Sequence, residues 1–570
     1  MNKREQGAVG SQSGRMSGAE AMVRMLQLHG VKHIFGLCGD TSLPLYDALA
    51  RLDHGMQHIL TRDERSAAYM ADGYARVSGR VGVCEGPSGG GATYLLPGIV
   101  EANESSIPVL GITTDIATTS RGRYALTELD QEALYRPLTK WNAVIDRADK
   151  LPEMVRNAFR EMTSGKPGAA HLGLPFDVQN GPVQETAVWA EADLGRYPSR
   201  RSGPDPDAVK RAAAALASAK LPVFVCGGGV VIAGAEKELA ALATLLGAPV
   251  ATTVSGQGSI AEDHPLSLGV VGSNGGTLPT REALMQADLV VFIGCRAGSV
   301  TTERWRYPAP GTRVVHIDAD AAVPGTNYNT EVALISDAKI ALSALLSELG
   351  KKNPREGQKI VSEAKSRKFS EFRSLAMRDD VPILPERIVA TLQEILPRDA
   401  TVVCDPGTPC PYFSAYYEFR EAGRHFISNR AHGALGYSMA AAVGAHFGRP
   451  RTKTVSVMGD GSFGFTAGEL ETIVRLRVPL LMVVISNASY GWIKAGQKSG
   501  FGQRYFSVDF SRTDHARVAE AFGVKAFKVE TPESLKPALI AAAEYGGPAL
   551  VDVITQPLHE ARAPVSEWVA

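Results

Sequence analysis

Short apolar runs alternate with longer helical stretches along almost the whole of this 570-residue chain. In its first third, the strand-sized runs are HIFGL, GVCEG, IPVLGIT and AAHLGLP, with Ala-rich stretches between them. The same alternation returns in LPVFVCGGG, ADLVVFIGCR and TRVVHIDAD, and again in ATVVCDPG, TKTVSVMGDGS and PLLMVVISN. Such alternation is typical of β–α–β units, whose parallel strands are covered by the intervening helices. We therefore predict an α/β fold with parallel sheets.

Two breaks in this pattern divide the chain into three units of ordinary domain size. A polar, proline-containing stretch, GRYPSRRSGPDPD, follows the first unit, and a charged stretch, GKKNPREGQKIVSEAKSRKFSEFRS, follows the second. The second stretch reads as a solvated helical linker. The predicted organisation is a disordered tail at 1–16, an N-terminal domain at 17–190, a central domain at 205–350, a linker at 351–380, a C-terminal domain at 381–556 and a C-terminal tail at 557–570.

The overall composition excludes several classes of function. Lys plus Arg and Asp plus Glu each number 60, so the balanced charge predicts neither a nucleic-acid partner nor an anionic membrane surface. No apolar run approaches the ~20 residues of a membrane span, and the first residues lack the apolar core of a secretory signal. The six cysteines are scattered without a CxxC pair, which indicates reduced core thiols. We expect a soluble, cytoplasmic protein that acts on a small molecule.

The most specific motif lies in the third unit. A strand-like run ends in Gly459-Asp460-Gly461 and passes into an amphipathic stretch, and the next strand-like run, PLLMVVIS, ends at Asn487. A helix that begins after a glycine turn presents free N–H groups and a positive dipole end to a phosphate. Asp460 and Asn487 add a carboxylate and a neutral oxygen, and Mg²⁺ prefers a few such ligands completed by phosphate oxygens and water. GDG alone is typical of an ordinary strand–turn–helix junction. GDG together with Asn487 at the end of the next strand is much more specific.

This combination resembles the signature of enzymes that depend on thiamine diphosphate (ThDP). The resemblance implies that Asp460 and Asn487 bind Mg²⁺ through their side chains and Ser489 through its carbonyl. It places the diphosphate against the same segment and the loop DPGTP, and the bent cofactor against HGALGYSMAAAVGA, where Leu435 supplies the aliphatic support. The implied cofactor-binding residues in this domain are Gly407, Thr408, Ala434, Leu435, Asp460, Gly461, Ser462, Asn487, Ser489, Tyr490 and Gly491.

The N-terminal domain resembles the pyrimidine-binding domain of the same family. HILTRDERSAAYMADGYAR carries a glutamate, Glu64, at a strand end that leads into an Ala-rich helix. A buried carboxyl group at this position holds the aminopyrimidine in its reactive tautomer. Gly39, facing the thiazolium, and Pro87, in the glycine-rich turn GPSGGG, match neighbouring family positions. In the family, this glutamate and the GDG segment of one active site come from two different chains, so the resemblance implies a homodimer or homotetramer with active sites at the subunit interface.

The central unit is similar to the domain that binds FAD or ADP in acetolactate synthases. CGGG, GVVGSNGG, GCRAGSV, HIDAD and SDA occur in the expected order. The residues implied for a nucleotide are Gly228, Gly272, Arg296, Asp318 and Asp337. Equally open is that these are ordinary α/β turns and that the domain binds no nucleotide.

The residues expected around the substrate depart from those of acetolactate synthases. Leu126-Thr127-Glu128 stand where the family has Phe-Gln-Glu, so that Thr127 takes the catalytic glutamine's place. Gly496 stands where a tryptophan shapes the second-substrate pocket, and Trp492 lies four residues earlier. We expect a C–C lyase or carboligase that decarboxylates a 2-oxo acid and transfers the remainder to an acceptor, but not classical acetolactate synthesis.

Three further possibilities stay open at this stage. TELDQ (127–131) resembles a segment of 2-hydroxyacyl-CoA lyases and oxalyl-CoA decarboxylases, which gives an alternative substrate class. A non-catalytic regulatory protein with the ThDP fold is a minor alternative. His432 is a candidate proton shuttle, and Tyr490 and Lys494 are candidates for substrate contact.

Overall fold

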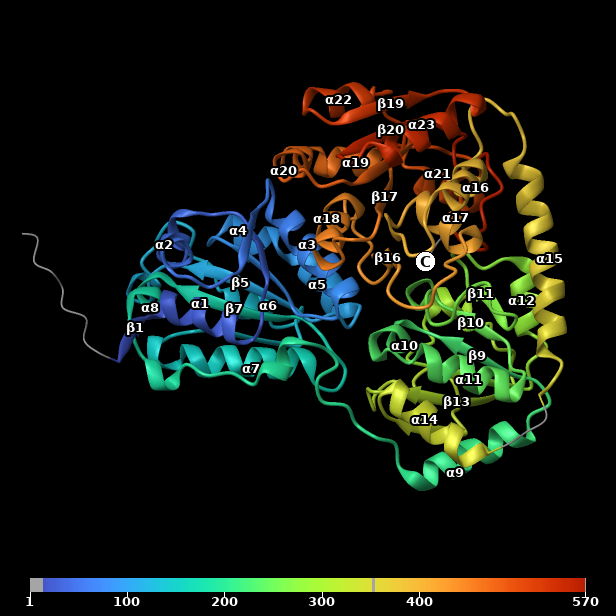
Figure 1. The fold of residues 1–570 in the computed structure, drawn as a ribbon, viewed down its shortest axis with the longest axis horizontal. Helices are drawn as coiled ribbons and strands as arrows, with labels where there is room; N and C mark the ends of the chain where they lie inside the picture. The colour runs from blue at the N-terminus through green and yellow to red at the C-terminus, as the bar shows by residue number, and fades with distance from the viewer. Residues whose placement is uncertain (1–13, 351–353, 569–570) are drawn as a thin grey trace, which may run out of the picture.

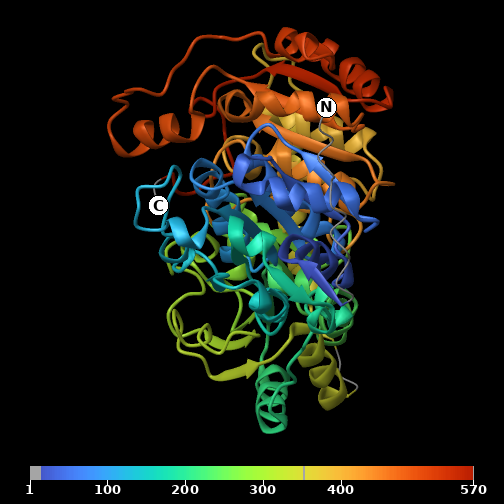
Figure 2. The same cartoon turned by 90° about the vertical axis from the view of Figure 1, so that its left-hand side faces the viewer.

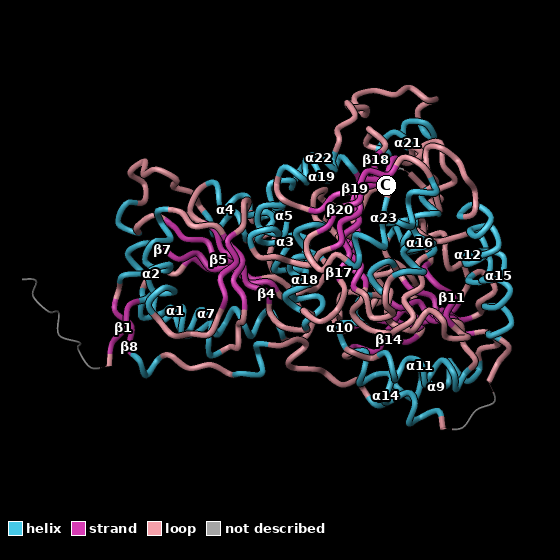
Figure 3. The backbone as a smooth tube through the Cα atoms, turned by 45° about the horizontal axis from the view of Figure 1, so that its top comes forward, coloured by secondary structure: helices cyan, strands magenta, loops and turns pink. Residues whose placement is uncertain are grey.

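The computed structural model describes residues 14–350 and 354–568, which form three α/β domains (Figure 1). Figure 3 shows the strands gathered into separate sheets with helices and loops around them. In the described part of the chain, each domain has one six-stranded sheet in which all neighbouring strands are parallel. The predicted fold class is therefore confirmed. Among the described residues, no helix combines the length and apolar character needed to cross a membrane.

The N-terminal domain has the strand order β3-β2-β4-β5-β7-β6. Its central strands β4 and β5 are buried along their whole length, as expected for a sheet covered on both faces. The strands are β2 (His33–Gly36), β3 (Gln57–Leu60), β4 (Gly82–Gly86), β5 (Val109–Asp115), β6 (Trp141–Val144) and β7 (Ala170–Pro175). The helices are α1 (Gly18–Leu28), α2 (Leu43–Arg51), α3 (Glu64–Ser78), α4 (Gly90–Tyr94), α5 (Leu96–Glu104), α6 (Gln131–Tyr135), α7 (Leu151–Thr163) and α8 (Phe176–Asn180).

The start of this domain differs from the sequence prediction. β1 (Arg15–Ser17) pairs antiparallel with β8 (Pro182–Gln184), so Arg15 and Met16 belong to the domain and not to a disordered tail. The strand pairing supplies hydrogen bonds that the local sequence does not reveal. Residues 1–13 of the predicted tail lie outside the described residues. Figure 2 brings this domain to the front of the molecule.

The central domain has the strand order β11-β10-β9-β12-β13-β14. Its strands are β9 (Pro222–Cys226), β10 (Val250–Thr252), β11 (Ser267–Val270), β12 (Leu289–Ile293), β13 (Arg313–Asp318) and β14 (Val332–Ile335). Its helices are α9 (Pro206–Ser218), α10 (Gly228–Ala233), α11 (Glu236–Leu246), α12 (Leu278–Leu284), α13 (Ser299–Thr302) and α14 (Ala338–Leu349).

The C-terminal domain has the strand order β16-β15-β17-β18-β20-β19, with β17 and β18 side by side at its centre. The strands are β15 (Thr401–Cys404), β16 (Phe426–Ser428), β17 (Thr454–Gly459), β18 (Leu481–Ser486), β19 (Lys525–Val529) and β20 (Ala549–Ile554). The helices are α16 (Pro385–Ile395), α17 (Pro409–Tyr416), α18 (Ser438–Gly448), α19 (Asp460–Thr466), α20 (Leu470–Arg475), α21 (Gly491–Gly500), α22 (His515–Ala521) and α23 (Pro532–Glu544).

The predicted linker contains a long helix that packs against its neighbours. α15 (Gly357–Ala376) runs along the edge of both the central and the C-terminal domain in Figure 1. It buries Val361, Ala364, Phe372 and also Lys368, whose Nζ donates to the carbonyl oxygen of Ala415 at 2.9 Å. The charged sequence of this segment suggested a solvated connection, but one face of the helix is part of the interdomain packing.

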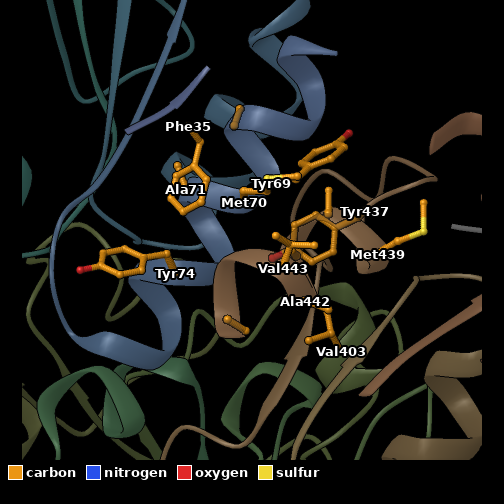
Figure 4. Close-up of a cluster of buried hydrophobic side chains, with 14 of the residues drawn as sticks. Phe35, Tyr69, Met70, Ala71, Tyr74, Val403, Tyr437, Met439, Ala442 and Val443 are labelled. Atoms are coloured by element: carbon orange, nitrogen blue, oxygen red, sulfur yellow. The ribbon is translucent and has the colours of Figure 1, made fainter. Parts of the chain in front are cut away.

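The N-terminal and C-terminal domains meet through α3 and α18, which cross at the centre of a shared apolar cluster (Figure 4). A Cβ on Gly73 would lie 2.1 Å from the carbonyl oxygen of Ala441, and one on Gly444 would lie 1.9 Å from that of Met70. The two glycines therefore let the helix backbones approach each other closely. The same crossing holds a buried polar group, in which Arg76 pairs with Asp72 at 2.8 Å and with Glu101 at 3.1 Å.

Candidate active site

Asp460 is held by backbone N–H groups at the junction of β17 and α19. Its Oδ1 accepts from Gly461 at 2.9 Å, and its Oδ2 accepts from Asn487 at 2.8 Å and from Ala488 at 2.6 Å. Burial raises the pKa of Asp460, and these three N–H donors partly oppose that rise. The carboxylate is thus fixed before any ligand arrives, and it retains lone-pair capacity for a cation.

The segment after β18 turns sharply beside this carboxylate. Ala488 has a φ of +54°, and the Oδ1 of Asn487 accepts from both the backbone N–H and the hydroxyl of Ser489, at 3.3 and 3.1 Å. These local bonds orient the amide oxygen that the sequence predicts as a metal ligand. Asp460, Asn487 and Ser489 are therefore brought together, as the motif requires.

A cavity of about 370 Å³ opens over this cluster. Of the predicted cofactor residues it is lined by Gly407, Thr408, Leu435, Asp460, Gly461, Ser462, Ser489, Tyr490 and Gly491. A Cβ on Gly407, Gly433 or Gly459, which also line it, would meet nothing within 4 Å. Because these glycines have no side chains, the backbone forms part of the cavity surface. Exposed backbone N–H groups of this kind suit a diphosphate.

The donor set of the cluster fits Mg²⁺ bound together with a diphosphate. Within 14–350 and 354–568, no group of three His, Cys, Asp or Glu side chains forms a metal site. Asp460 contributes one carboxylate and Asn487 one amide oxygen, so a hard cation here needs further oxygens from its ligand and from water.

The loop that carries Leu435 is fixed by a residue of the N-terminal domain. Glu101 of α5 accepts backbone N–H groups from Ala431 at 3.4 Å, His432 at 2.7 Å and Gly433 at 3.4 Å, while Arg76 neutralises it. The carbonyl of Ala434 accepts from Asn429 at 2.6 Å, and Ala434 itself does not line the cavity. His432 is exposed, so its contribution to the loop is through its backbone.

Glu64 begins α3 in the N-terminal domain and is 7% exposed. A Cβ on Gly91 would lie 2.4 Å from Pro87 and 3.1 Å from Oε1 of Glu64, and a Cβ on Gly39 would also lie 2.4 Å from Pro87. The structure thus brings the three predicted residues Gly39, Glu64 and Pro87 close together. Burial raises the pKa of Glu64, with a smaller contribution from the nearby buried Glu85, so this carboxyl group takes up a proton readily.

The two halves of the predicted site do not share a cavity in one chain. Among the described residues, none that lines the 370 Å³ cavity precedes Ser273, so Gly39, Glu64, Pro87 and Thr127 are absent from it. This separation is the geometry expected if a second chain brings its own Glu64 to the cavity.

Thr127 lies on an irregular segment beside the glycine-rich turn GPSGGG. The backbone φ of Thr127 is +68°, and its hydroxyl oxygen lies 2.7 Å from that of Ser88. A Cβ on Gly89 would lie 2.9 Å from the Cβ of Thr127. The neighbouring Leu126 is 84% exposed. Farther along, Gln131 is buried and its amide nitrogen donates to the carbonyl of Thr114 at 3.0 Å, which ties the segment to β5.

A second cavity, of about 330 Å³, lies at the carboxyl ends of the central strands. Gly228, Arg296, Asp318 and Asp337 line it, together with residues of the N-terminal domain and Arg430. Asp337 caps α14 and pairs with Arg201 at 2.9 Å, and Arg296 pairs with Glu104 at 3.3 Å.

Gly272 does not line this cavity. Its φ is +104°, and a Cβ on it would lie 2.2 Å from the carbonyl oxygen of Val300. Position 272 therefore needs a glycine because two backbone segments pack closely there. A glycine-rich sequence pattern alone does not distinguish this role from ligand binding.

Several residues at the first cavity were not predicted from the sequence. Ser273, Asn274 and Arg304 of the central domain, Arg430, and Glu567 and Trp568 of the C-terminal tail all line it. With its amide oxygen toward the guanidinium, Asn274 accepts from Arg430 at 3.0 and 2.7 Å. These residues come from separate domains, so no local motif marks them.

Tyr490 and Lys494, which were both candidates for substrate contact, differ in position. Tyr490 lines the cavity and packs edge-on against Phe510 at 5.3 Å. Lys494 pairs with Asp509 at 2.7 Å and lies over the ring of Tyr505, and it does not line the cavity.

Comparison with known protein families covers all three domains. Residues 16–134 match the model described as "Thiamine pyrophosphate enzyme, N-terminal TPP binding domain". Residues 209–345 match the central domain of the same family, and residues 405–553 match its C-terminal TPP binding domain.

Individual relatives agree over almost the full length. A "Probable acetolactate synthase large subunit" of Methanocaldococcus jannaschii is 36% identical over 95% of this chain and 92% of its own length. An "Acetolactate synthase" of Arthrospira platensis is 31% identical over 95% and 94%. The "Acetolactate synthase isozyme 3 large subunit" of Escherichia coli is 30% identical over 93% and 92%.

Proposed function

Since this chain belongs to the thiamine pyrophosphate enzyme family and is an acetolactate synthase-like, ThDP-dependent enzyme, we propose that it decarboxylates a 2-oxo acid and ligates the remaining fragment to a second carbonyl compound. The observation that carries this proposal is the preorganised cluster of Asp460, Asn487 and Ser489 at the mouth of a glycine-lined cavity. ThDP, when bound, supplies the electron sink for cleaving a bond next to a carbonyl.

The described residues suggest a division of labour. Asp460 and Asn487, with the carbonyl of Ser489, would hold Mg²⁺, and the backbone at Gly407, Gly461 and Ser462 would face the diphosphate. Leu435 would support the cofactor from one side. The carboxyl group of Glu64 would hold a proton against the pyrimidine ring, for which its raised pKa is suited.

We further propose that the active form is a homo-oligomer, a dimer at least. A complete site needs both Glu64 and Asp460, and in one chain Glu64 does not line the cavity that Asp460 lines. In such an oligomer, Glu64 of a second copy of this chain would complete the site around Asp460.

Two sequence departures fall at positions that resemble substrate-contacting positions of acetolactate synthases. Thr127 replaces the catalytic glutamine of acetolactate synthases, and Gly496 replaces a pocket tryptophan. We propose that these changes give an acceptor preference different from that of the classical enzymes. The relatives reported above are named acetolactate synthases, which favours a 2-oxo acid donor over the acyl-CoA substrates suggested by TELDQ.

For the central cavity we propose a nucleotide, FAD or ADP, with Arg296 on its phosphate side and Asp318 on a polar group. An absorbance band at roughly 450 nm in the purified protein supports FAD, from the flavin's own chemistry. Colourless protein that releases ADP on denaturation supports ADP, and protein that releases neither contradicts the proposal.

The direct test of the proposed function is a screen for CO₂ release. Purified protein receives ThDP, Mg²⁺ and one 2-oxo acid at a time, with and without an aldehyde or 2-oxo acid acceptor. We expect CO₂ and a ligated hydroxyketone product. Cleavage of a 2-hydroxyacyl-CoA with no CO₂ from any 2-oxo acid would overturn the proposal.

A further inference from the structure

Five hydroxyl groups form a continuous chain of hydrogen bonds in the N-terminal domain. The hydroxyl oxygen of Thr127 lies 2.7 Å from that of Ser88, which lies 3.2 Å from that of Thr41. The Thr41 hydroxyl lies 2.8 Å from that of Thr114, which lies 3.1 Å from that of Ser42. These residues stand on or after β2, β4 and β5, which are neighbouring parallel strands, so their carboxyl ends meet at one edge of the sheet. The chain therefore joins segments that are far apart in the sequence.

The hydrogens of this chain point toward Thr127. A hydroxyl group has one proton to donate. Because Thr41 donates its proton to Ser88, the proton of Ser88 is left for Thr127. The proton of Thr127 then points away from the chain, to the carbonyl oxygen of Leu126 at 2.5 Å. Thr127 is therefore the donor end of the chain.

The inner part of the chain is shielded from water. Thr114 is 0% exposed and Ser88 is 5% exposed, and the backbone N–H of Ser88 also donates to the Thr41 hydroxyl at 3.2 Å. In such surroundings each hydrogen bond polarises the next, which makes the last hydroxyl a stronger donor. The φ of Thr127 is unusual for a β-branched residue and persists only where neighbouring contacts hold it. The bond to Ser88 is such a contact.

The donor end of the chain and Glu64 contact the same glycine-rich turn. A Cβ on Gly86 would lie 3.3 Å from Cγ of Glu64, and one on Gly91 would lie 3.1 Å from its Oε1. Gly89, inside this turn, approaches Thr127, since a Cβ there would lie 2.9 Å from the Cβ of Thr127. The chain thus places a hydroxyl donor across one short turn from the carboxyl group that the proposed function assigns to the cofactor.

We propose that Thr127 donates a hydrogen bond to a carbonyl oxygen of the bound substrate, and that Ser88 and Thr41 are positioning residues that act through it. On binding, the Thr127 proton turns from the carbonyl of Leu126 to that oxygen. A carbonyl oxygen gains negative charge when its carbon is attacked, so a donor that is already oriented stabilises the transition state more than the bound substrate. This inference rests on the proposed function, in which position 127 is expected to contact the substrate.

The first test removes the donor and keeps its shape. Wild-type protein and Thr127→Val receive ThDP, Mg²⁺ and the best 2-oxo acid, and CO₂ release is followed. We expect kcat to fall at least about tenfold while KM stays within about twofold, because an interaction made mainly in the transition state is lost. Thr127→Ser keeps the hydroxyl and should keep most of the wild-type kcat.

The second test asks whether Thr41 acts through Thr127. Thr41→Val should lower kcat about three- to tenfold with little change in KM, because Ser88 loses its donor and is free to turn its own proton away from Thr127. Thr41→Ser should stay near wild type. In the Thr127→Val background, Thr41→Val should cause no further loss, since residues that act as one unit are not additive. An equal loss in both backgrounds would show a role in the fold alone and would overturn the inference. Ser88→Ala gives the same comparison if Thr41→Val does not fold.

Thr163 provides a matched control in the same domain. It is 0% exposed, and its hydroxyl lies 2.9 Å from that of Ser199, outside the chain. Thr163→Val should leave kcat and KM unchanged. Wild-type protein that releases CO₂ while Thr127→Val or Thr41→Val keeps the wild-type kcat overturns this inference and leaves the proposed function intact. Wild-type protein that releases no CO₂ from any 2-oxo acid overturns both.

Discussion

The N-terminal and C-terminal domains share one architecture, a six-stranded parallel sheet with helices on its faces, yet the carboxyl group at the start of a helix has different neighbours in each. Asp460 receives three backbone N–H bonds and is fixed as a ligand. Glu64 is buried beside glycines and a second buried acid, Glu85, and burial raises its pKa. Glu64 and Asp460 both begin a helix, so the comparison shows that this position alone does not determine what an acidic side chain does. Burial raises the pKa of both acids, but three backbone N–H groups oppose that rise at Asp460 and favour the ionised form that a cation needs, whereas the nearby acids Asp63 and Glu85 raise the pKa of Glu64 further.

The largest expected effect tests the C-terminal side of this contrast. Asp460→Ala removes the carboxylate and leaves the N–H groups of Asn487 and Ala488 without their acceptor. We expect ThDP affinity in the presence of Mg²⁺ to fall by at least about 100-fold, because a charge-assisted contact to the cation is lost. Isothermal titration calorimetry measures this, and an unchanged Kd would contradict the assignment.

The next test asks whether the two acids act in one site from two chains. Glu64→Gln should lose nearly all activity while keeping ThDP affinity within a few-fold of wild type, and Asp460→Ala should be inactive as well. Co-refolded or co-expressed in equal amounts, the two variants should recover about one quarter of wild-type activity, because half of the dimers are mixed and each has one intact site of two. A site built within one chain would give no recovery.

A third change affects the contact between the two domains. Gly73→Ala places a methyl group 2.1 Å from the carbonyl oxygen of Ala441, so α3 and α18 must separate. We expect destabilisation of about 3 kcal/mol, measured by urea unfolding. Gly203→Ala is the control, since its Cβ would meet Ile340 at an ordinary 3.7 Å. Equal stability of the two variants would show that the close helix approach is unimportant.

The smallest effect concerns the pH dependence of stability at Glu64. Because the pKa of Glu64 is raised in the folded protein, the folded state binds more protons than the unfolded state between the two pKa values. The stability contribution of Glu64 therefore falls as pH rises through its folded pKa. Glu64→Gln should raise the Tm by about 1–2 °C at pH 8 and by nothing near pH 4.5. A constant difference across this range would contradict an unpaired buried carboxyl group.

The sequence predicts those parts of the molecule that depend on local pattern. The alternation of strands and helices determines the fold class, and the residues at strand ends, Asp460 and Asn487, follow from motif and spacing because parallel strands end at one edge. The sequence places Arg15 and Met16 in a tail because their strand partner lies far along the chain. Trp568 and Glu101 reach the site only through tertiary packing, so the residues next to them in the sequence do not indicate their roles.

The hydrogen bonds from the loop at 431–433 to Glu101 also bear on how the protein responds to heating. The loop is held across a domain boundary, whereas each sheet is held within its own domain. We therefore expect gentle warming to inactivate the enzyme before its far-ultraviolet circular dichroism changes, as the α3–α18 contact loosens and Leu435 is released. Inactivation at this stage should reverse on cooling, because every strand that must be re-formed is still in place.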